Sequence, residues 1–208
     1  NYTVMLMLMC IRKALYVMMR SHTADYSLGP ICGHEMQNMT VGIIGTGRIG
    51  KAVIKNLSGF DCKIIAYDPY PSKELKNVEY VSLDELYTRS DIISLHTFLS
   101  DETYHMINKD SIAKMKDGVI LINNSRGQLV VEQDLADALN SGKVYAAGLD
   151  VVSTEPIKGD NPLLKAKNCI ITPHISWAAQ ASRQRIMDIT VDNIKAFLAG
   201  NTVNRVNK

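Results

Sequence analysis

The chain has 208 residues, of which 46% are hydrophobic, and its formal net charge at pH 7 is +2. This length accommodates one large domain or two small ones. The 23 Lys and Arg residues are scattered among 21 Asp and Glu residues. A continuous basic surface for nucleic acid is therefore not expected.

The first twenty residues are apolar but interrupted. Residues 4–11 and 14–19 are separated by Arg12 and Lys13, which is too broken for a membrane span of about 20 apolar residues. The basic start and the small-residue cleavage site of a signal peptide are also missing. We therefore predict a buried or interface helix and then a polar connection, together residues 1–38, and no membrane partner. Because the first residue is Asn rather than Met, we expect an excerpt from a longer protein.

Four cysteines, Cys10, Cys32, Cys62 and Cys169, lie far apart and form no C-x-x-C pair. This pattern favours reduced thiols that act as small core hydrophobes over disulfides or metal ligands. No His/Cys cluster has the spacing of a zinc site, so we expect no metal. Reduced thiols predict a cytoplasmic protein.

Residues 40–44 form a short β-branched run that predicts a buried parallel strand. The run leads directly into Gly45-Thr46-Gly47-Arg48-Ile49-Gly50, a G-x-G-x-x-G, and a helical apolar pattern follows. A second apolar run, residues 62–67, ends at Asp68. A G-x-G-x-x-G alone is a weak signal. Between a strand and a helix, with an acid about 20 residues later, it indicates a dinucleotide-binding site.

The chemistry of dinucleotide binding explains this spacing. Gly45 allows a tight turn, Gly47 lets the backbone approach a pyrophosphate, and Gly50 lets the helix pack close to the strand. Amides at the helix N-terminus would face the phosphates. Asp68 can accept hydrogen bonds from the adenosine ribose hydroxyls and would repel a 2′-phosphate, which predicts NAD rather than NADP. The alternative is a Gly-rich turn in which Asp68 only caps Pro69.

Strands and helices alternate in the rest of the chain. Further strands are expected at residues 79–81, 92–96, 118–123, 146–151 and 169–172. A capping box over residues 82–85 predicts the start of one helix, and further helices are expected at residues 110–115, 131–139 and 178–199. Because the strands are almost wholly apolar, we predict an α/β fold with a doubly wound parallel sheet, a three-layer α/β/α Rossmann fold. We assign residues 39–177 to this domain and residues 178–208 to a C-terminal helix and tail.

Ligands of such a sheet bind outside the carboxyl ends of the strands. Arg126, Glu155 and His174 each follow one expected strand, so the three side chains can converge on one crevice. Taken singly, each has an ordinary interpretation: a surface charge, a solvated turn acid and a capped loop residue.

Taken together, the segments 45–50, 124–127, 150–156 and 172–174 resemble the D-isomer-specific 2-hydroxyacid dehydrogenase family, over nearly the whole chain. Ser94-Leu95-His96 and the residues after it are similar to the segment that this family places over the cofactor. Phe98 is a departure, because the family usually has Pro there.

The resemblance implies hydride transfer between NAD(H) and a small 2-keto or D-2-hydroxy acid. His174 would be the general acid and base, Glu155 would orient its imidazole, and Arg126 would hold the substrate carboxylate and polarise the carbonyl. The implied cofactor contacts are Gly45, Gly47, Arg48, Ile49, Gly50, Asp68, His96, Thr97, Asn124, Ser125, Asp150, His174 and Trp177. For His96, a structural role is an equal alternative.

Full-length members of this family have two domains with the active site between them. Only a helix and a connection precede the nucleotide-binding motif, so we expect the N-terminal substrate lobe to be absent, residues 178–208 to return to that lobe, and the chain alone to bind NAD but turn over poorly. Family members dimerise through the nucleotide-binding domain, and the Met-rich opening helix is our candidate for part of a homodimer interface.

The substrate remains open between two branches. Residues 161–164 and 174–177 with Arg183 resemble the glycerate dehydrogenase/hydroxypyruvate reductase branch, whereas residues 38–67 are close to the D-lactate dehydrogenase branch. An alternative function is an NAD(H)-sensing interaction protein of the same fold, similar to the corepressors related to this family.

Overall fold

A computed structural model describes residues 1–27, 31–76 and 78–207. The chain separates into two compact units, Asn1–Pro173 and His174–Lys208. Part of the expected polar connection, residues 28–30, lies outside the described residues, as does the last residue of the expected C-terminal tail.

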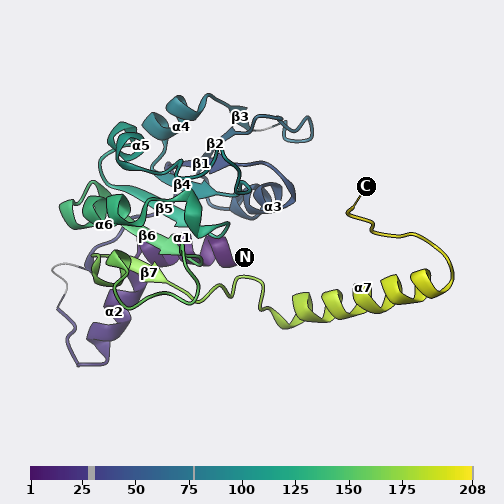
Figure 1. The fold of residues 1–208 in the computed structure, drawn as a ribbon. Coiled ribbons are helices and arrows are strands. Elements are labelled where there is room, and N and C mark those ends of the chain that lie inside the picture. Colours follow the sequence, from purple (N-terminus) through teal and green to yellow (C-terminus); the bar gives the residue numbers. More distant parts are fainter. Residues whose placement is uncertain (28–30, 77, 208) are drawn as a thin grey trace. The chain divides into compact units, whose positions relative to one another are not determined.

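Unit 1 contains a seven-stranded sheet in which every pair of neighbouring strands is parallel. The strands are β1 (Thr40–Ile44), β2 (Lys63–Tyr67), β3 (Glu79–Tyr80), β4 (Ile92–Leu95), β5 (Val119–Asn123), β6 (Val144–Leu149) and β7 (Cys169–Ile171). Their order is β3-β2-β1-β4-β5-β6-β7, so the winding reverses between β1 and β4 (Figure 1). The predicted doubly wound parallel sheet is confirmed, and the reversal point is where such sheets bind ligands.

Helices cover both faces of this sheet (Figure 1). The α-helices of unit 1 are α1 (Tyr2–Ile11), α2 (Ala14–Ser21), α3 (Arg48–Leu57), α4 (Leu83–Arg89), α5 (Lys109–Lys114) and α6 (Glu132–Ser141), with short 3₁₀ turns at Gly127–Leu129 and Pro162–Lys165. Along β5, Ile120 and Ile122 belong to the core with α1 and α3, whereas Leu121 belongs to the core with α4, α5 and α6. This alternation is the strand period of two, and it confirms the three-layer prediction.

The opening segment forms two helices where one was predicted. The chain breaks at Lys13, which has a left-handed φ of 50°, and the two helices are bent by 66°. Helix α1 packs on β5 and β6 with Leu6 and Met7 fully buried, whereas α2 has no buried residue. In the described ranges no single helix is long and apolar enough to cross a membrane; only the bent pair α1 and α2 passes such a test.

The cysteines are free thiols, and three of the four fit the prediction of small core residues. Cys10 is buried and Cys62 and Cys169 are half-buried, and burial raises the pKa of Cys10 and of Cys169 to about 12. Cys32 is exposed, so the prediction is wrong there: in its connection it is Met36, not Cys32, that is buried in the core.

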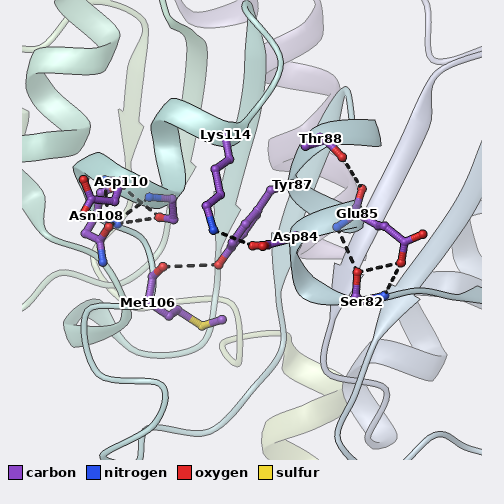
Figure 2. A network of polar contacts seen from close by, with 10 residues as sticks. Ser82, Asp84, Glu85, Tyr87, Thr88, Met106, Asn108, Asp110 and Lys114 are labelled. Carbon is purple, nitrogen blue, oxygen red and sulfur yellow. Dashed lines mark hydrogen bonds and ion pairs between the residues drawn. The ribbon is translucent and has the colours of Figure 1, made fainter.

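Two capping boxes begin the helices α4 and α5 (Figure 2). Ser82 accepts the Glu85 N–H at 3.2 Å, and the Glu85 carboxylate accepts the Ser82 N–H at 2.9 Å, as the sequence predicts. Asn108 accepts the backbone N–H groups of Asp110 and Ser111 at 3.0 and 3.1 Å. These caps satisfy backbone donors that a helix leaves without partners.

Side-chain contacts also join α4 to α5 and to the segment that precedes α5 (Figure 2). Lys114 on α5 pairs with Asp84 on α4 at 2.8 Å, and the Tyr87 hydroxyl donates to the Met106 carbonyl at 3.3 Å. Burial raises the pKa of Tyr87 well above its usual value, so the hydroxyl stays protonated as a donor.

Unit 2 consists of a short segment and the helix α7 (Gln180–Leu198), where the sequence predicts a long amphipathic helix. The helix has no buried residue. Its large apolar side chains are exposed: Ile186, Met187, Ile189, Val191, Ile194, Phe197 and Leu198. Gly200, with φ of 76°, follows its end.

Candidate functional site

The three glycines after β1 differ in their surroundings. Gly45 has φ of 95°, and a Cβ there would lie 2.6 Å from the His96 carbonyl oxygen after β4. A Cβ on Gly50 would lie 2.0 Å from the Gly45 carbonyl oxygen. At Gly47, the N-cap of α3, no described atom other than those of its two chain neighbours lies within 4 Å of such a Cβ. The turn and the close packing agree with the prediction, and the backbone at Gly47 is open to a ligand.

Asp68 follows β2 and faces the glycine loop. Its Oδ2 accepts both the Thr46 N–H at 2.6 Å and the Thr46 hydroxyl at 2.9 Å, and its Oδ1 accepts the Tyr70 N–H at 2.8 Å. Burial raises the pKa of Asp68, but these three hydrogen bonds outweigh burial and hold the pKa below its usual value. The carboxylate is therefore ionised at neutral pH.

The hydrogen bonds continue from Thr46 to β3. The Tyr80 hydroxyl donates to the Thr46 hydroxyl oxygen at 3.0 Å and accepts the Ser72 N–H at 2.9 Å. Thr46 and Tyr80 were not predicted from the sequence, because Thr46 occupies a variable position of the motif and Tyr80 belongs to a distant two-residue strand.

His96 and Ser94 interact at the end of β4, where the His96 Nε2 lies 2.9 Å from the Ser94 Oγ. Burial lowers the pKa of His96 to about 4, although the residue as a whole is only half-buried, so the imidazole is neutral at neutral pH. The neighbouring Thr97 is half-buried and lies against Gly45. Phe98 is exposed.

The segment after β5 forms a tight turn. The Asn123 amide accepts the Ser125 N–H at 2.9 Å and donates to the Arg126 carbonyl at 2.9 Å. The Ser125 hydroxyl donates to the Leu95 carbonyl at 2.8 Å, which ties this turn to β4. Within the described chain, neither the oxygen nor the nitrogen of the buried Asn124 amide has a hydrogen-bond partner. A buried amide of this kind fits a ligand with its own donors and acceptors.

Arg126 is exposed, and its guanidinium donates to the Ser125 carbonyl at 2.7 Å. A Cβ on the next residue, Gly127, would lie 2.0 Å from the Val152 carbonyl oxygen. The turn that carries Arg126 is thus packed against the segment that follows β6. Only glycine fits this contact without a shift of the backbone.

Asp150, directly after β6, is 1% exposed. Its N–H donates to the Asn123 carbonyl at 2.9 Å, and its carboxylate accepts the Thr172 hydroxyl at 2.6 Å. Asp150 therefore connects the ends of β5 and β7.

The loop that follows Asp150 is held by Glu132, the first residue of α6. The Glu132 carboxylate accepts the Ser153 N–H at 2.7 Å, the Ser153 hydroxyl at 2.8 Å and the Asn161 amide at 2.9 Å. Glu155 lies in this loop with an exposed side chain, and its Oε1 accepts the Val152 N–H at 3.2 Å. Glu132 was not predicted from the sequence, because only three-dimensional contacts with Ser153 and Asn161 relate it to the loop that carries Glu155.

His174 and Trp177 belong to unit 2. His174 has a left-handed φ of 52°, and its carbonyl accepts the Trp177 indole N–H at 2.6 Å. The predicted convergence of His174 with Arg126 and Glu155 stays a prediction, because these residues lie in different units.

Comparison with protein families decides the class of this site. Residues 4–176 match the model of the D-isomer specific 2-hydroxyacid dehydrogenase, NAD binding domain. The chain belongs to this dehydrogenase family. The expected family is therefore confirmed, and so is NAD as the cofactor of this domain.

Relatives within the dehydrogenase family include reductases. The chain is 63% identical over 176 residues to a hydroxypyruvate reductase of Blautia hydrogenotrophica, a match that covers 84% of the chain and 55% of the relative. It is 41% identical over 212 residues to an aromatic 2-oxoacid reductase of Clostridium sporogenes, covering 95% of the chain and 64% of the relative. The chain thus spans about 55 to 64% of these relatives.

A solved structure of the family has the same fold. The D-lactate dehydrogenase of Aquifex aeolicus, complexed with NAD and lactic acid, superimposes with a TM-score of 0.88 at 37% identity. This match covers 96% of the chain and 66% of that structure.

The residues of this dehydrogenase domain fit NAD. The backbone at Gly47 is open, Asp68 is ionised beside the glycine loop, and the Asn124 amide lacks a partner among the described residues. Arg48 and Ile49 form the first turn of α3, where Ile49 is 67% exposed. Across the described ranges, no group of three His, Cys, Asp or Glu side chains could hold a metal ion.

Proposed function

We propose that the full-length protein is an NAD-dependent oxidoreductase that interconverts a small 2-keto acid and its D-2-hydroxy acid. The observation that carries this proposal is the family match over residues 4–176. The 63% identity with a hydroxypyruvate reductase favours hydroxypyruvate or a similar acid. The likeness to a D-lactate dehydrogenase keeps pyruvate as a second candidate.

In the proposed reduction, bound NADH supplies a hydride to the carbonyl carbon, and the reaction consumes one proton. Arg126 presents a planar fork of donors that binds the substrate carboxylate and polarises the carbonyl. His174 gives its proton to the carbonyl oxygen and recovers one from solvent. Glu155 accepts the other ring N–H and keeps the imidazole oriented. In the oxidation, His174 acts as the base.

The chain spans only 55 to 64% of the first curated relatives, so we propose that it binds NAD but turns over slowly. The exposed apolar side chains of α7 support a role in covering the remaining part of such an enzyme, which we assign to an N-terminal substrate lobe. A lobe that closes over the site would exclude water and complete the substrate pocket.

We also propose a homodimer and a cytoplasmic location. Four free thiols support a reducing compartment. Helix α1 buries most of its apolar side chains against its own sheet. The exposed residues of α2, including Met18 and Met19, are therefore the better candidates for a dimer contact. The relatives named above are reductases and dehydrogenases, which gives the alternative of an NAD(H)-sensing interaction protein no support.

The test has two steps. The 208-residue chain is titrated with NADH and NADPH, with fluorescence of its single tryptophan, Trp177, as the readout. Saturable NADH binding with much weaker NADPH binding is expected. The full-length protein is then assayed with NADH and a panel of 2-keto acids. Tight NADH binding without turnover of any acid in the panel would contradict the proposal.

A further inference from the structure

Asp68 is the residue that we expect to select the nucleotide, and its carboxylate already accepts hydrogen bonds from protein donors. A carboxylate offers about four acceptor positions. Three are taken by the Thr46 N–H, the Thr46 hydroxyl and the Tyr70 N–H. Both Thr46 donors bind Oδ2, so the open position is on Oδ1.

The orientation of the Thr46 hydroxyl is restricted, because its oxygen accepts a hydrogen bond from the Tyr80 hydroxyl at 3.0 Å. Tyr80 is itself oriented by the Ser72 N–H at 2.9 Å. The result is a relay in which each hydroxyl accepts one hydrogen bond and donates the next, from Ser72 through Tyr80 and Thr46 to Asp68. Such chains polarise their members in the same direction.

The centre of the relay is buried, whereas Ser72, Tyr80 and Asp68 are half-buried. Thr46 is 3% exposed, and the half-buried Tyr80 ring packs against the core that also contains α1 and α3. Leaving the buried Thr46 hydroxyl without a hydrogen-bond partner would cost free energy of folding, so the folded state favours the intact relay. The relay spans the glycine loop, the end of β2 and β3, which are the elements around an adenosine ribose in such a fold.

We propose that Thr46 and Tyr80 are positioning residues for nucleotide selection, because they fix the rotation of the Asp68 carboxylate and couple it to the glycine loop. A fixed carboxylate presents Oδ1 to a ribose hydroxyl and keeps its negative charge where a 2′-phosphate would lie. A carboxylate that rotates loses both effects. The inference rests on NAD binding by this domain and adds the residues that enforce the choice of NAD over NADP.

The test uses variants that remove one hydroxyl each. Tyr80→Phe and Thr46→Val retain the ring and the branched side chain but break the relay. Each is expected to weaken NADH binding by about 3- to 10-fold, the value of one hydrogen bond, and to weaken NADPH binding less. The NADH/NADPH preference therefore falls. Thr46→Ser, which keeps the hydroxyl, should restore most of the preference.

One control separates an effect of the relay from a general loss of stability, and one double variant tests whether Thr46 and Tyr80 act together. Tyr87→Phe removes another tyrosine hydroxyl, the donor to the Met106 carbonyl in Figure 2, and should leave the NADH/NADPH preference unchanged. The double variant of Thr46→Val and Tyr80→Phe should cost little more than Thr46→Val alone, because both act through one relay.

A wild-type NADH/NADPH preference in folded Tyr80→Phe and Thr46→Val would overturn the proposal. An equal change in Tyr87→Phe would overturn it too, since the effect would then be structural. Failure of the unmodified chain to bind NADH would overturn the nucleotide assignment itself, and the inference with it, which is a different result from an unchanged preference.

Discussion

Glu132 binds Ser153 twice: one carboxylate oxygen accepts the Ser153 N–H at 2.7 Å and the other accepts its hydroxyl at 2.8 Å. The same carboxylate also accepts the Asn161 amide. One side chain on α6 therefore holds both ends of the loop that contains Glu155.

Glu132→Ala should destabilise the chain by about 1–3 kcal/mol, because half-buried donors lose their partner. This corresponds to a fall in Tm of roughly 2–4 °C for each kcal/mol at this chain length. Thermal unfolding measures the change. The matched control is Asp137→Ala on the same helix, an exposed carboxylate bound by Gln133, which should change the stability by less than about 0.5 kcal/mol. An equal loss in both variants would contradict the role given to Glu132.

Alanine at two glycines of the loop should separate folding from binding. Gly50→Ala places a Cβ 2.0 Å from the Gly45 carbonyl oxygen and should destabilise the chain by about 1–3 kcal/mol or more. Gly47→Ala meets no described atom within 4 Å other than those of its two chain neighbours and should unfold like the unmodified chain. Its methyl group would nevertheless obstruct a pyrophosphate, so NADH affinity should fall by about tenfold or more. Full NADH affinity in Gly47→Ala would contradict the predicted approach of the cofactor.

His96 makes stability depend on pH. Its pKa is lowered from 6.5 to about 4 by burial, so the unfolded chain binds a proton between these values and the folded chain does not. The contribution of His96 to stability is therefore complete above pH 6.5 and is lost as the pH falls toward 4. Urea unfolding from pH 7 to 4 should show a shallower decline in His96→Gln than in the unmodified chain. Parallel profiles, or an NMR titration midpoint near 6.5, would contradict this assignment.

Arg126→Lys should impair turnover by the full-length protein without changing NADH binding. An ammonium cannot reproduce the planar fork that we propose for the substrate carboxylate. We expect kcat/KM for the preferred 2-keto acid to fall by about 10- to 100-fold, since a hydrogen bond to a charged group contributes about 1.5–3 kcal/mol. Arg89→Lys, on α4, where it pairs with Glu79, is the control. An unchanged kcat/KM in Arg126→Lys would contradict the proposed role of Arg126 in binding the substrate carboxylate.

Charges placed on α2 should prevent dimerisation. Met18 and Met19 are 58% and 64% exposed, so Met18→Glu and Met19→Glu together should cost the folded chain little. If α2 forms the proposed contact, light scattering should show a shift from dimer to monomer. Lys55→Glu, on the exposed side of α3, controls for the added negative charge. A persistent dimer in the double variant would place the interface elsewhere.

Local sequence patterns predicted most of the sheet. The strands at residues 40–44 and 118–123 were predictable because buried parallel strands are apolar throughout, and the helix end before Gly142 because its φ of 84° suits glycine. The break at Lys13 was missed, since the two charged residues Arg12 and Lys13 interrupt the apolar segment but do not reveal a left-handed backbone. Strand β6 begins at Val144, two residues before the expected start.

The candidate site was predictable only in part. Gly45, Gly50 and Asp68 could be placed, because a motif fixes their spacing along the chain. Tyr80 and Glu132 could not, because their contacts join segments that no local pattern relates. The meeting of Arg126, Glu155 and His174 remains a prediction from the family resemblance.

Helix α1 has a consequence for how the chain is made. Its Leu6, Met7 and Ile11 pack against β5 and β6, and β6 ends only at Leu149. On the ribosome, this apolar helix must therefore wait on the order of 10 s before its binding surface exists. During that interval the apolar face of α1 has no surface within the chain to cover it, and we expect the nascent chain to be most prone to aggregate.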